Sequence, residues 1–165
     1  RKFGFITLCS KRKVFENKHI KKLGPEPFDR NFNLDYFIKY IIGKKRVIKD
    51  LLMDQKFVSG LGNIYVNEIL FFSNINPKRK ISNLKEFELL QIIRNIKKVL
   101  KKAILFGGST IRDFKSSSGK IGEFQQHFKV YGKKGHQCSN LDCKGKVKKI
   151  TISNRSSFFC SICQK

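Results

Sequence analysis

The feature that most constrains this chain is a set of four cysteines within its last 28 residues. They form two close pairs, Cys138 with Cys143 and Cys160 with Cys163, and sixteen residues separate the pairs. Each pair can present two sulfurs from one turn, and four thiolates suit a closed tetrahedral Zn²⁺ site that leaves no position for water. The spacer KGKVKKITISNRSSFF alternates as a β-hairpin does, so we expect a zinc ribbon whose metal is structural.

Disulfides are the alternative for these four cysteines. The chain has five cysteines in all, and the fifth, Cys9, stands alone near the other end. An odd count and a spacing typical of metal ligands favour a reducing, cytoplasmic setting over a secreted disulfide scaffold. We expect Cys9 to be a reduced thiol buried in a strand.

The charge of the chain limits its partners. Thirty-six Lys and Arg face 12 Asp and Glu, a formal net charge of +24, and 16 Phe and 4 Tyr are interleaved among them. Such a chain favours nucleic acid as its anionic partner. A solvated basic surface is the plain alternative. A membrane is the weaker one, because no segment shows a clean basic amphipathic face and no apolar run is long enough to span a bilayer.

The pattern of the chain changes along its length. Residues 1–23 alternate as strands do, and two strands cannot stand alone, so they resemble the end of a larger sheet. Residues 24–32 begin with the stiff sequence GPEP and read as a linker. Residues 116–123, SSSGKIGE, read as a flexible loop, and 124–131 return to an extended pattern.

Between the linker and this loop the apolar residues recur with helical period. Glu86 is placed for a capping box at the start of the longest helix, and glycines stand where helices would end. We expect helices over residues 33–43, 47–52, 64–72 and 82–107.

The stretch VSGLGNIYVNE joins two of these helices and carries two closely spaced glycines. Gly60 and Gly62 let the backbone approach another chain closely, and N–H groups that enter a helix can bind an anion. Asn63 can cap that helix and donate its amide to a phosphate. A tight helix–helix turn that needs glycine only for packing is the alternative.

Arg155 lies near the middle of the expected zinc hairpin. A hairpin stapled by zinc holds its tip rigidly, so an arginine there can enter a DNA groove or clamp a phosphate. An exposed loop arginine without a function is the alternative.

Several long motifs, in order, resemble the bacterial formamidopyrimidine-DNA glycosylase family. They are RKFG, LGPEP, MDQKFVSGLGNIYVNEILF, NPKR, GGSTIRDF, SSSGKIGEF, VYGKKG and the cysteine-bearing end FFCSICQK. The resemblance implies a mixed α+β fold with three parts. These are the remnant of a β-sandwich (1–23), a helix–two-turns–helix domain with a lesion loop at 116–124 (33–125), and a zinc finger (126–165), with the linker at 24–32.

The resemblance also implies an activity. The family excises oxidised purines, such as 8-oxoguanine and formamidopyrimidine, from double-stranded DNA and then cleaves the abasic strand by β,δ-elimination. We therefore expect a base-excision repair enzyme of the bacterial cytoplasm that binds DNA containing oxidised purines or abasic sites, acts as a monomer and carries one structural zinc.

Family residues carry over to matching positions of this chain. Asn63 and Gly62 correspond to the phosphate-binding turn. Arg155 corresponds to the zinc-finger arginine that grips phosphate and is assigned as proton donor in δ-elimination. The resemblance further implies DNA contacts by Arg1, Phe3, Lys44 and Lys49, a lesion loop that includes Ser118, Gly119, Lys120 and Gly122, and zinc ligation by Cys138, Cys143, Cys160 and Cys163.

Two departures from the family pattern qualify these expectations. The family's N-terminal Pro-Glu pair, whose proline attacks the sugar, has no counterpart in these 165 residues. We therefore expect this chain to bind DNA but to be inactive alone. The first cysteine pair is spaced C-x4-C where the family usually has C-x2-C, which alters the first knuckle of the zinc site.

Two other classes of function stay open at this point. One is a non-catalytic zinc-ribbon protein that binds nucleic acid. The other is a structural protein whose basic surface docks on an acidic partner, and the salt dependence of DNA binding separates it from the first two, because phosphate contacts weaken steeply as salt rises.

Overall fold

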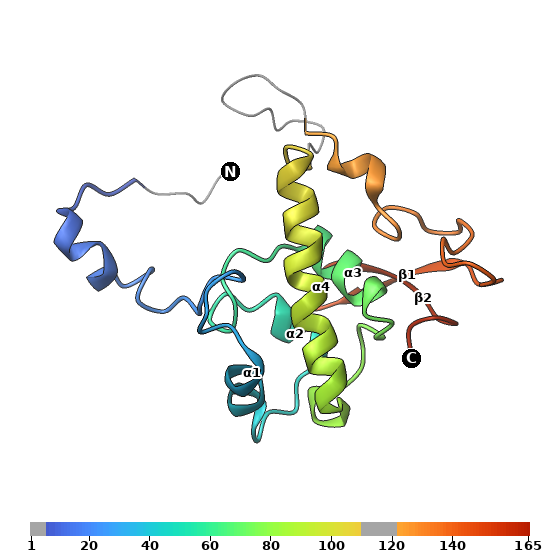
Figure 1. The fold of residues 1–165 in the computed structure, drawn as a ribbon, viewed down its shortest axis with the longest axis horizontal. Coiled ribbons are helices and arrows are strands. Elements are labelled where there is room, and N and C mark those ends of the chain that lie inside the picture. The colour runs from blue at the N-terminus through green and yellow to red at the C-terminus, as the bar shows by residue number, and fades with distance from the viewer. Residues whose placement is uncertain (1–5, 110–121) are drawn as a thin grey trace.

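The computed structural model describes residues 6–109 and 122–165, and helices predominate in them. The α-helices are α1 (Leu34–Ile41), α2 (Ile48–Leu52), α3 (Asn63–Phe72) and α4 (Glu86–Leu105), the strands are β1 (Val147–Ile152) and β2 (Arg155–Cys160), and 3-10 helices lie at Lys11–Glu16, Ile81–Asn83 and Phe124–His127. Helix α4 runs through the middle of the molecule, with the N-terminal segment on one side and the β1–β2 hairpin on the other (Figure 1).

Two helices end at glycines, as the sequence predicts. Gly43 after α1 has φ +71°, and Gly107 and Gly108 after α4 have φ +68° and +82°. These left-handed conformations are open to glycine without strain. At the other end of α1 the Asn33 side chain accepts a hydrogen bond from the Tyr36 N–H at 2.9 Å, which satisfies one of the unpaired donors of the first turn.

The longest helix begins later than predicted. Residues 82–83 belong to a 3-10 turn, and α4 starts at Glu86. Glu88, not Glu86, completes the capping box by accepting the Lys85 N–H at 2.7 Å. The same carboxylate accepts two further hydrogen bonds from the Arg79 guanidinium, at 2.5 and 2.9 Å. This ion pair draws Glu88 into a buried position, whereas Glu86 stays exposed, and it sets the start of the helix.

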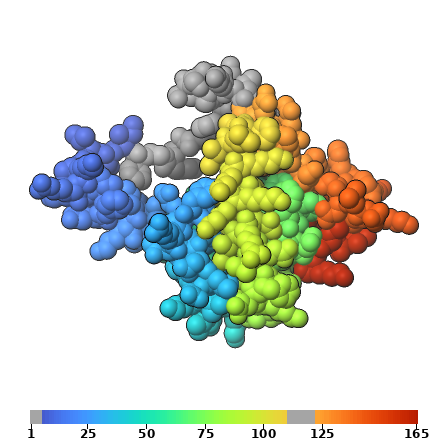
Figure 2. Space-filling view, in the orientation of Figure 1, coloured from blue at the N-terminus to red at the C-terminus, as the bar shows by residue number. Residues whose placement is uncertain are grey.

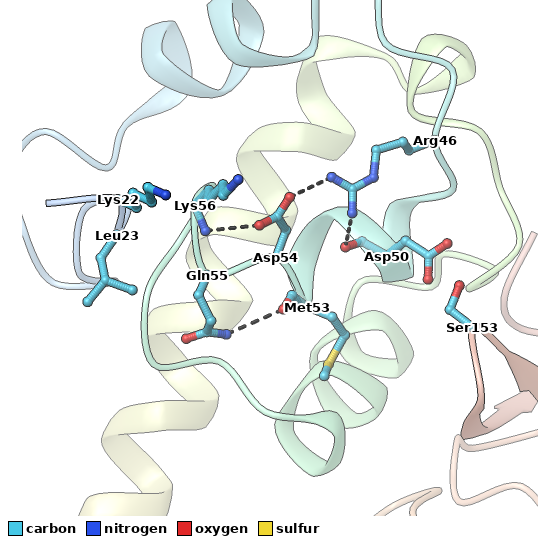
Figure 3. Close-up of a pocket in the computed structure, with 9 residues that line it drawn as sticks. All are labelled: Lys22, Leu23, Arg46, Asp50, Met53, Asp54, Gln55, Lys56 and Ser153. Atoms are coloured by element: carbon cyan, nitrogen blue, oxygen red, sulfur yellow. Dashed lines mark hydrogen bonds and ion pairs between the residues drawn. The ribbon is translucent and has the colours of Figure 1, made fainter. Parts of the chain in front are cut away.

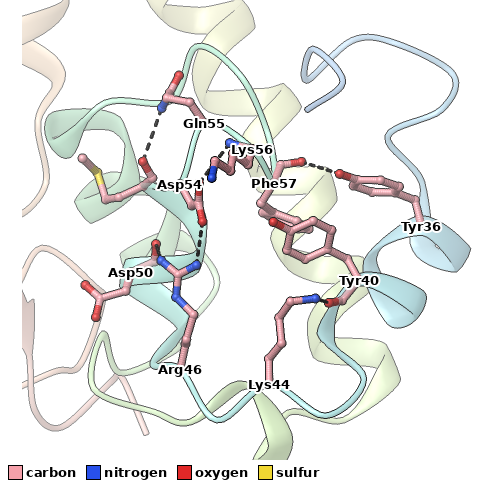
Figure 4. A network of polar contacts seen from close by, with 10 residues as sticks. Tyr36, Tyr40, Lys44, Arg46, Asp50, Asp54, Gln55, Lys56 and Phe57 are labelled. Carbon is pink, nitrogen blue, oxygen red and sulfur yellow. Dashed lines mark hydrogen bonds and ion pairs between the residues drawn. The ribbon is translucent and has the colours of Figure 1, made fainter. Parts of the chain in front are cut away.

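The aromatic centre of the core lies just before the turn that contains Gly60 and Gly62, called the glycine turn below. Phe57 is fully buried and packs on Phe37 and Tyr40, each with ring centroids 4.8 Å from its own, and stacks on Tyr36 at 5.8 Å. The Tyr36 hydroxyl donates to the Phe57 carbonyl at 2.8 Å (Figure 4). Burial of one such ring stabilises the fold by roughly 1.5–3 kcal/mol, so this cluster fixes the segment that leads into Gly60.

Residues 6–23 do not form the predicted strands. Residues Lys11–Glu16 are a 3-10 helix, and Cys9 is exposed, not buried. Ile6 and Leu8 are also fully exposed. A strand needs a neighbour to satisfy its backbone groups, and within the described residues the sheet contains β1 and β2 alone. Figure 2 shows this segment standing out from the body of the molecule.

The predicted hairpin is present between the cysteine pairs. Strands β1 and β2 are antiparallel, with Ile152 opposite Arg155 beside the turn. Ser153 and Asn154 form a two-residue turn with φ +46° and +59°, the pattern of a type I′ hairpin. Arg155 is therefore the first residue of β2, and Cys160 is the last.

The segment after the loop is also not extended as predicted. Residues Phe124–His127 form a 3-10 helix. Phe124 and Phe128, four residues apart, are both buried and their rings meet edge to face at 5.7 Å. A helical turn brings two rings at this spacing to one side, whereas a strand would place them in line along one face over about 13 Å. Burial of this pair thus favours the turn.

Candidate metal centre and nucleic-acid interface

The four predicted cysteine ligands meet at one point. Their sulfurs all lie within 4.8 Å of one another. The Sγ atoms of Cys138 and Cys163 are 3.7 Å apart, as are those of Cys143 and Cys160. Tetrahedral thiolates about 2.3 Å from a zinc ion lie about 3.8 Å apart, whereas disulfide sulfurs lie about 2.0 Å apart. The geometry fits a metal ion held by four cysteines, and the C-x4-C knuckle accommodates it.

Gly145 lies against this centre. Its carbonyl accepts the Cys138 N–H at 2.7 Å, and its N–H donates to the Cys143 sulfur at 3.4 Å. A Cβ at this position would lie 2.7 Å from the Cys160 sulfur. Burial and, to a lesser degree, the three neighbouring sulfurs raise the pKa of the Cys138 thiol to about 12, against the opposing effect of a backbone hydrogen bond at Asn140. A bound cation supplies the charge that lets such crowded sulfurs ionise.

The glycine turn has the open geometry expected for an approach to another molecule. Gly60 has φ +84°, and no atom of the described residues lies within 4 Å of a Cβ built on Gly60 or Gly62. Gln55 braces the turn by accepting the Gly60 N–H at 2.8 Å and donating to the Leu61 carbonyl at 2.9 Å. Helix α3 starts directly after Gly62, so its first N–H groups, which have no partner within the helix, point toward this open space.

Asn63 does not cap α3 as predicted. It is the first residue of the helix, and Gly62 occupies the cap position without a side-chain bond. The Asn63 amide instead donates to the Ser156 carbonyl of β2 at 3.0 Å. One turn later, Asn67 accepts the Phe158 N–H at 2.6 Å. The side chains of α3 therefore hold the β1–β2 hairpin beside the glycine turn.

Lys49 of α2 is buried and turned toward the same hairpin. It is 1% exposed, and its ammonium donates to the Ser156 carbonyl at 3.0 Å and the Ser157 hydroxyl at 2.6 Å. Burial lowers the pKa of Lys49 to about 8; Asp50 opposes this shift and Arg155 adds to it. In this structure the Lys49 ammonium is enclosed by the protein, so a DNA phosphate cannot reach it.

Lys44 and Arg155, the other described cations of the predicted site, differ in exposure. Lys44 lies over the Tyr40 ring, 4.0 Å from its centroid, and donates to the Tyr40 carbonyl. Arg155 is exposed at the start of β2. Of these two cations, Arg155 is the one that borders the pocket beside the glycine turn.

That pocket brings together segments far apart in sequence. It has a volume of about 430 Å³ and is lined by Gly60, Gly62, Asn63, Ile64, Tyr65, Ser109, Tyr131 and Arg155. The hydroxyl of Ser109 is buried against it and has no hydrogen-bond partner among residues 6–109 and 122–165. A ligand can satisfy such a polar group. Sequence reasoning missed Ile64, Tyr65, Ser109 and Tyr131 as site residues, although the motifs GGSTIRDF and VYGKKG contain two of them.

Glu68 fixes the wall of the pocket that carries Tyr131. It is 1% exposed, and its carboxylate accepts three consecutive backbone N–H groups, from Lys129, Val130 and Tyr131, at 2.7, 3.0 and 2.8 Å. Burial raises the pKa of Glu68, and these three donors act against that rise. The charged side chain of α3 thus holds the segment that leads into the zinc ribbon.

A larger pocket of about 630 Å³ lies on another part of the surface (Figure 3). Its lining includes the Arg46–Asp54 ion pair, in which Nη1 and Oδ2 are 2.6 Å apart, with the Asp50 carbonyl also bonded to Arg46 (Figures 3 and 4). None of the predicted site residues lines it. The predicted residues Gly62, Asn63 and Arg155 instead line the smaller pocket, so we place the candidate interface there.

Some predicted site residues lie outside the described part of the chain, namely Arg1, Phe3, Ser118, Gly119 and Lys120. Gly122, at the described end of the predicted lesion loop, is buried, and a Cβ there would lie 2.4 Å from the Gly108 carbonyl oxygen. This close approach places Gly122 against Gly108, the residue before Ser109. Within residues 6–109 and 122–165, no helix is both long and apolar enough to cross a membrane.

Comparison with known proteins agrees with this arrangement. A family profile described as the formamidopyrimidine-DNA glycosylase H2TH domain matches residues 23–115. Formamidopyrimidine-DNA glycosylase of Zymomonas mobilis is 41% identical over the whole chain, which spans 60% of that relative. The Listeria innocua enzyme is also 41% identical, with the same coverage.

The solved structures that resemble this chain are also of Fpg and MutM proteins. Lactococcus lactis Fpg in complex with abasic-site DNA superposes with a TM-score of 0.86 at 36% identity, over 95% of this chain and 57% of that one. MutM (Fpg) from Thermus thermophilus gives 0.83 at 34% identity, over 90% and 56%. The helices, the glycine turn and the four-cysteine hairpin are therefore those of a known fold, and the chain belongs to the formamidopyrimidine-DNA glycosylase family.

Proposed function

We propose that this chain is part of a DNA-repair enzyme that removes oxidised purines and cleaves the resulting abasic strand by β,δ-elimination. The support comes from its relatives, which are formamidopyrimidine-DNA glycosylases, and from the solved structures of that family. Lactococcus lactis Fpg is in complex with Fapy-dG DNA and with abasic-site DNA, and MutM with carbocyclic 8-oxo-G DNA. The chain spans about 60% of those relatives. Its share of the work is to bind the damaged DNA.

One observation carries this proposal: the pocket of about 430 Å³ between the glycine turn and Arg155. Its open N–H groups and its arginine suit the phosphates beside a lesion, and its aromatic and apolar lining suits a base turned out of the helix. The Ser109 hydroxyl, which has no partner in the part of the chain that the structure describes, supplies a polar contact for such a base. Phe124, the last residue of the predicted lesion loop, packs on Tyr65 of the lining with ring centroids 5.7 Å apart.

We assign roles to the predicted residues on this basis. Gly62 and Asn63 bind a phosphate, the latter by exchanging its bond to Ser156 for one to DNA. Arg155 grips phosphate and acts as the proton donor of δ-elimination. Lys44, Arg1 and Phe3 add contacts to the DNA strand, and residues 116–124 close over the flipped base.

The metal in this proposal is Zn²⁺, held by Cys138, Cys143, Cys160 and Cys163. Four cysteine sulfurs form a closed site whose ion stabilises the fold and takes no part in the reaction. The enzyme acts as a monomer on chromosomal DNA in the bacterial cytoplasm, so sedimentation of the DNA complex is expected to give one chain per duplex.

Binding to a duplex with a single abasic-site analogue tests the proposal. We expect this chain to bind it at least about tenfold more tightly than undamaged duplex, and Arg155→Ala to remove about tenfold of that affinity, the value of one charge-assisted contact. The exposed Lys101 of α4, changed to Met, is the matched control for charge. Equal affinity for both duplexes, or full binding by Arg155→Ala, refutes the assignment and favours a general nucleic-acid-binding protein.

The catalytic part of the proposal has its own test. The 165 residues contain no counterpart of the family's Pro-Glu pair, so borohydride is expected to trap no covalent complex of this chain with 8-oxoguanine DNA. A trapped complex would show that a nucleophile lies within these residues.

A further inference from the structure

The outer edge of β2 is held by side chains from other elements. Pairing with β1 satisfies one edge of the strand. On the other edge, at every second residue, a backbone group bonds a side chain. Ser156 O accepts from Lys49 and Asn63 at 3.0 Å each, and Phe158 N donates to Asn67 at 2.6 Å. Helices α2 and α3 thus take the place of a third strand beside the half of β2 that starts at Arg155.

The metal alone cannot fix that half of the hairpin. Its nearest ligand in β2 is Cys160, five residues from Arg155, which in an extended strand is about 16 Å away. A two-stranded hairpin without further support is only marginally stable in water. An arginine meant for one phosphate therefore needs a second anchor near the turn.

Lys49 is the centre of this anchor. It reaches across 107 residues of sequence to the Ser156 carbonyl and also bonds the Ser157 hydroxyl at 2.6 Å. Burying an ammonium is costly unless its hydrogen bonds are made. Both acceptors belong to the two residues that follow Arg155. The buried ammonium therefore keeps its hydrogen bonds only while the backbone at the turn-proximal end of β2 stays ordered.

We propose that Lys49 is a positioning residue for Arg155. Its ammonium holds the Ser156 carbonyl and the Ser157 hydroxyl, also when Asn63 has exchanged its bond to Ser156 for one to DNA, and so sets where the Arg155 side chain leaves the strand at the rim of the pocket. This inference rests on the proposed function. It differs from a direct contact between Lys49 and DNA, because the lysine acts through the hairpin.

The first test measures the hairpin itself. Lys49→Met keeps the length and apolar stem of the side chain but removes its donors, and Lys101→Met is the control for loss of one charge. In metal-loaded protein without DNA, we expect Lys49→Met to retain one metal per chain while the amides of residues 155–158 exchange about tenfold faster. The control is expected to match the unaltered protein. Unchanged exchange in Lys49→Met overturns the proposal.

The second test measures coupling to Arg155 on abasic-site duplex. Lys49→Met and Arg155→Ala are each expected to weaken binding by about tenfold, and the double variant to bind no more weakly than Arg155→Ala alone. A hundredfold loss in the double variant, with a further drop of about 0.9 in the salt slope, marks Lys49 as an independent phosphate contact and overturns the proposal.

The two tests separate the inference from the function on which it rests. If Arg155→Ala binds normally, the proposed role of Arg155 in DNA binding fails, while exchange at residues 155–158 still decides whether Lys49 anchors the turn-proximal end of β2. If Lys49→Met does not fold, Ser157→Ala removes one acceptor instead. We then expect faster exchange at residues 155–158 with metal retained, and unchanged exchange again refutes the anchor.

Discussion

A single methyl group at Gly145 is expected to disable the metal centre. In Gly145→Ala the new Cβ would lie 2.7 Å from the Cys160 sulfur, whereas a relaxed carbon–sulfur contact is about 1 Å longer. Either the sulfur or the strand must move by that amount. Metal–ligand distances tolerate only about 0.2 Å, and the neighbour is a ligand whose backbone is held by Gln164 at 2.9 Å. The shift therefore displaces one of four ligands.

The magnitude follows from the chemistry of the site. Loss of outer-shell support alone weakens metal binding by about 10–100-fold, so displacement of a ligand is expected to cost at least about 100-fold. Competition with a coloured chelator at pH 7 measures this ratio on the purified chain. Because the binding free energy of such a metal is also folding free energy, Gly145→Ala is further expected to lower the thermal stability of the hairpin.

Leu141→Ala is the control for this prediction. Leu141 lies in the same C-x4-C knuckle but is 94% exposed, so its change is expected to leave metal affinity within about threefold of the unaltered chain. If Gly145→Ala holds zinc as tightly as Leu141→Ala does, the close packing of Gly145 on the sulfur does not constrain the centre, and the reasoning fails.

Two further predictions concern the buried carboxylates. Glu68→Gln keeps one acceptor oxygen but turns an amide toward the Lys129 N–H, so the free energy of unfolding in urea is expected to fall by about 1–3 kcal/mol, whereas the exposed Glu123→Gln changes it by less than about 0.5. For Glu88, burial pushes the pKa upward, but the Lys85 N–H and the Arg79 guanidinium outweigh it and the pKa lies below 4.5. The contribution of Glu88 to the free energy of unfolding is therefore fully present above pH 4.5 and is lost as the pH falls through the lower pKa of the folded protein. Glu88→Gln should flatten the decline of the urea midpoint below pH 4.5. An unchanged decline would contradict this.

The parts of the fold that the sequence predicts are those that depend on local chemistry. The cysteine spacing predicts the four-sulfur cluster, and the alternation between the pairs predicts the β1–β2 hairpin. Gly43 and Gly107 mark the ends of two helices because a left-handed residue is needed there. Each of these features depends on residues within one turn or one hairpin, so a single sequence contains the necessary information.

The features that could not be predicted depend on distant partners. Asn63 is a residue type that often caps a helix, but its amide donates a hydrogen bond to the carbonyl of Ser156, 93 residues away. Glu88 displaces Glu86 as the capping residue because Arg79 draws it inward. The alternation near Cys9 reads as strand, yet no strand within the described residues pairs with it. In each case a contact that local patterns do not encode overrides a local preference.

Two buried charged residues, Glu68 and Lys49, both position backbone that lines the pocket. Glu68 holds the backbone at Tyr131, and Lys49 holds the backbone next to Arg155. Tyr131 and Arg155 both line the pocket, and the Tyr131 ring packs edge to face on Phe158 of β2 at 5.1 Å. Apolar packing alone would leave the positions of the two segments that carry Tyr131 and Arg155 poorly defined, since dispersion contacts have little directionality. Hydrogen bonds from the helices to named backbone groups fix both walls in register with the glycine turn, so the shape of the pocket depends on the junction between the helices and the metal hairpin.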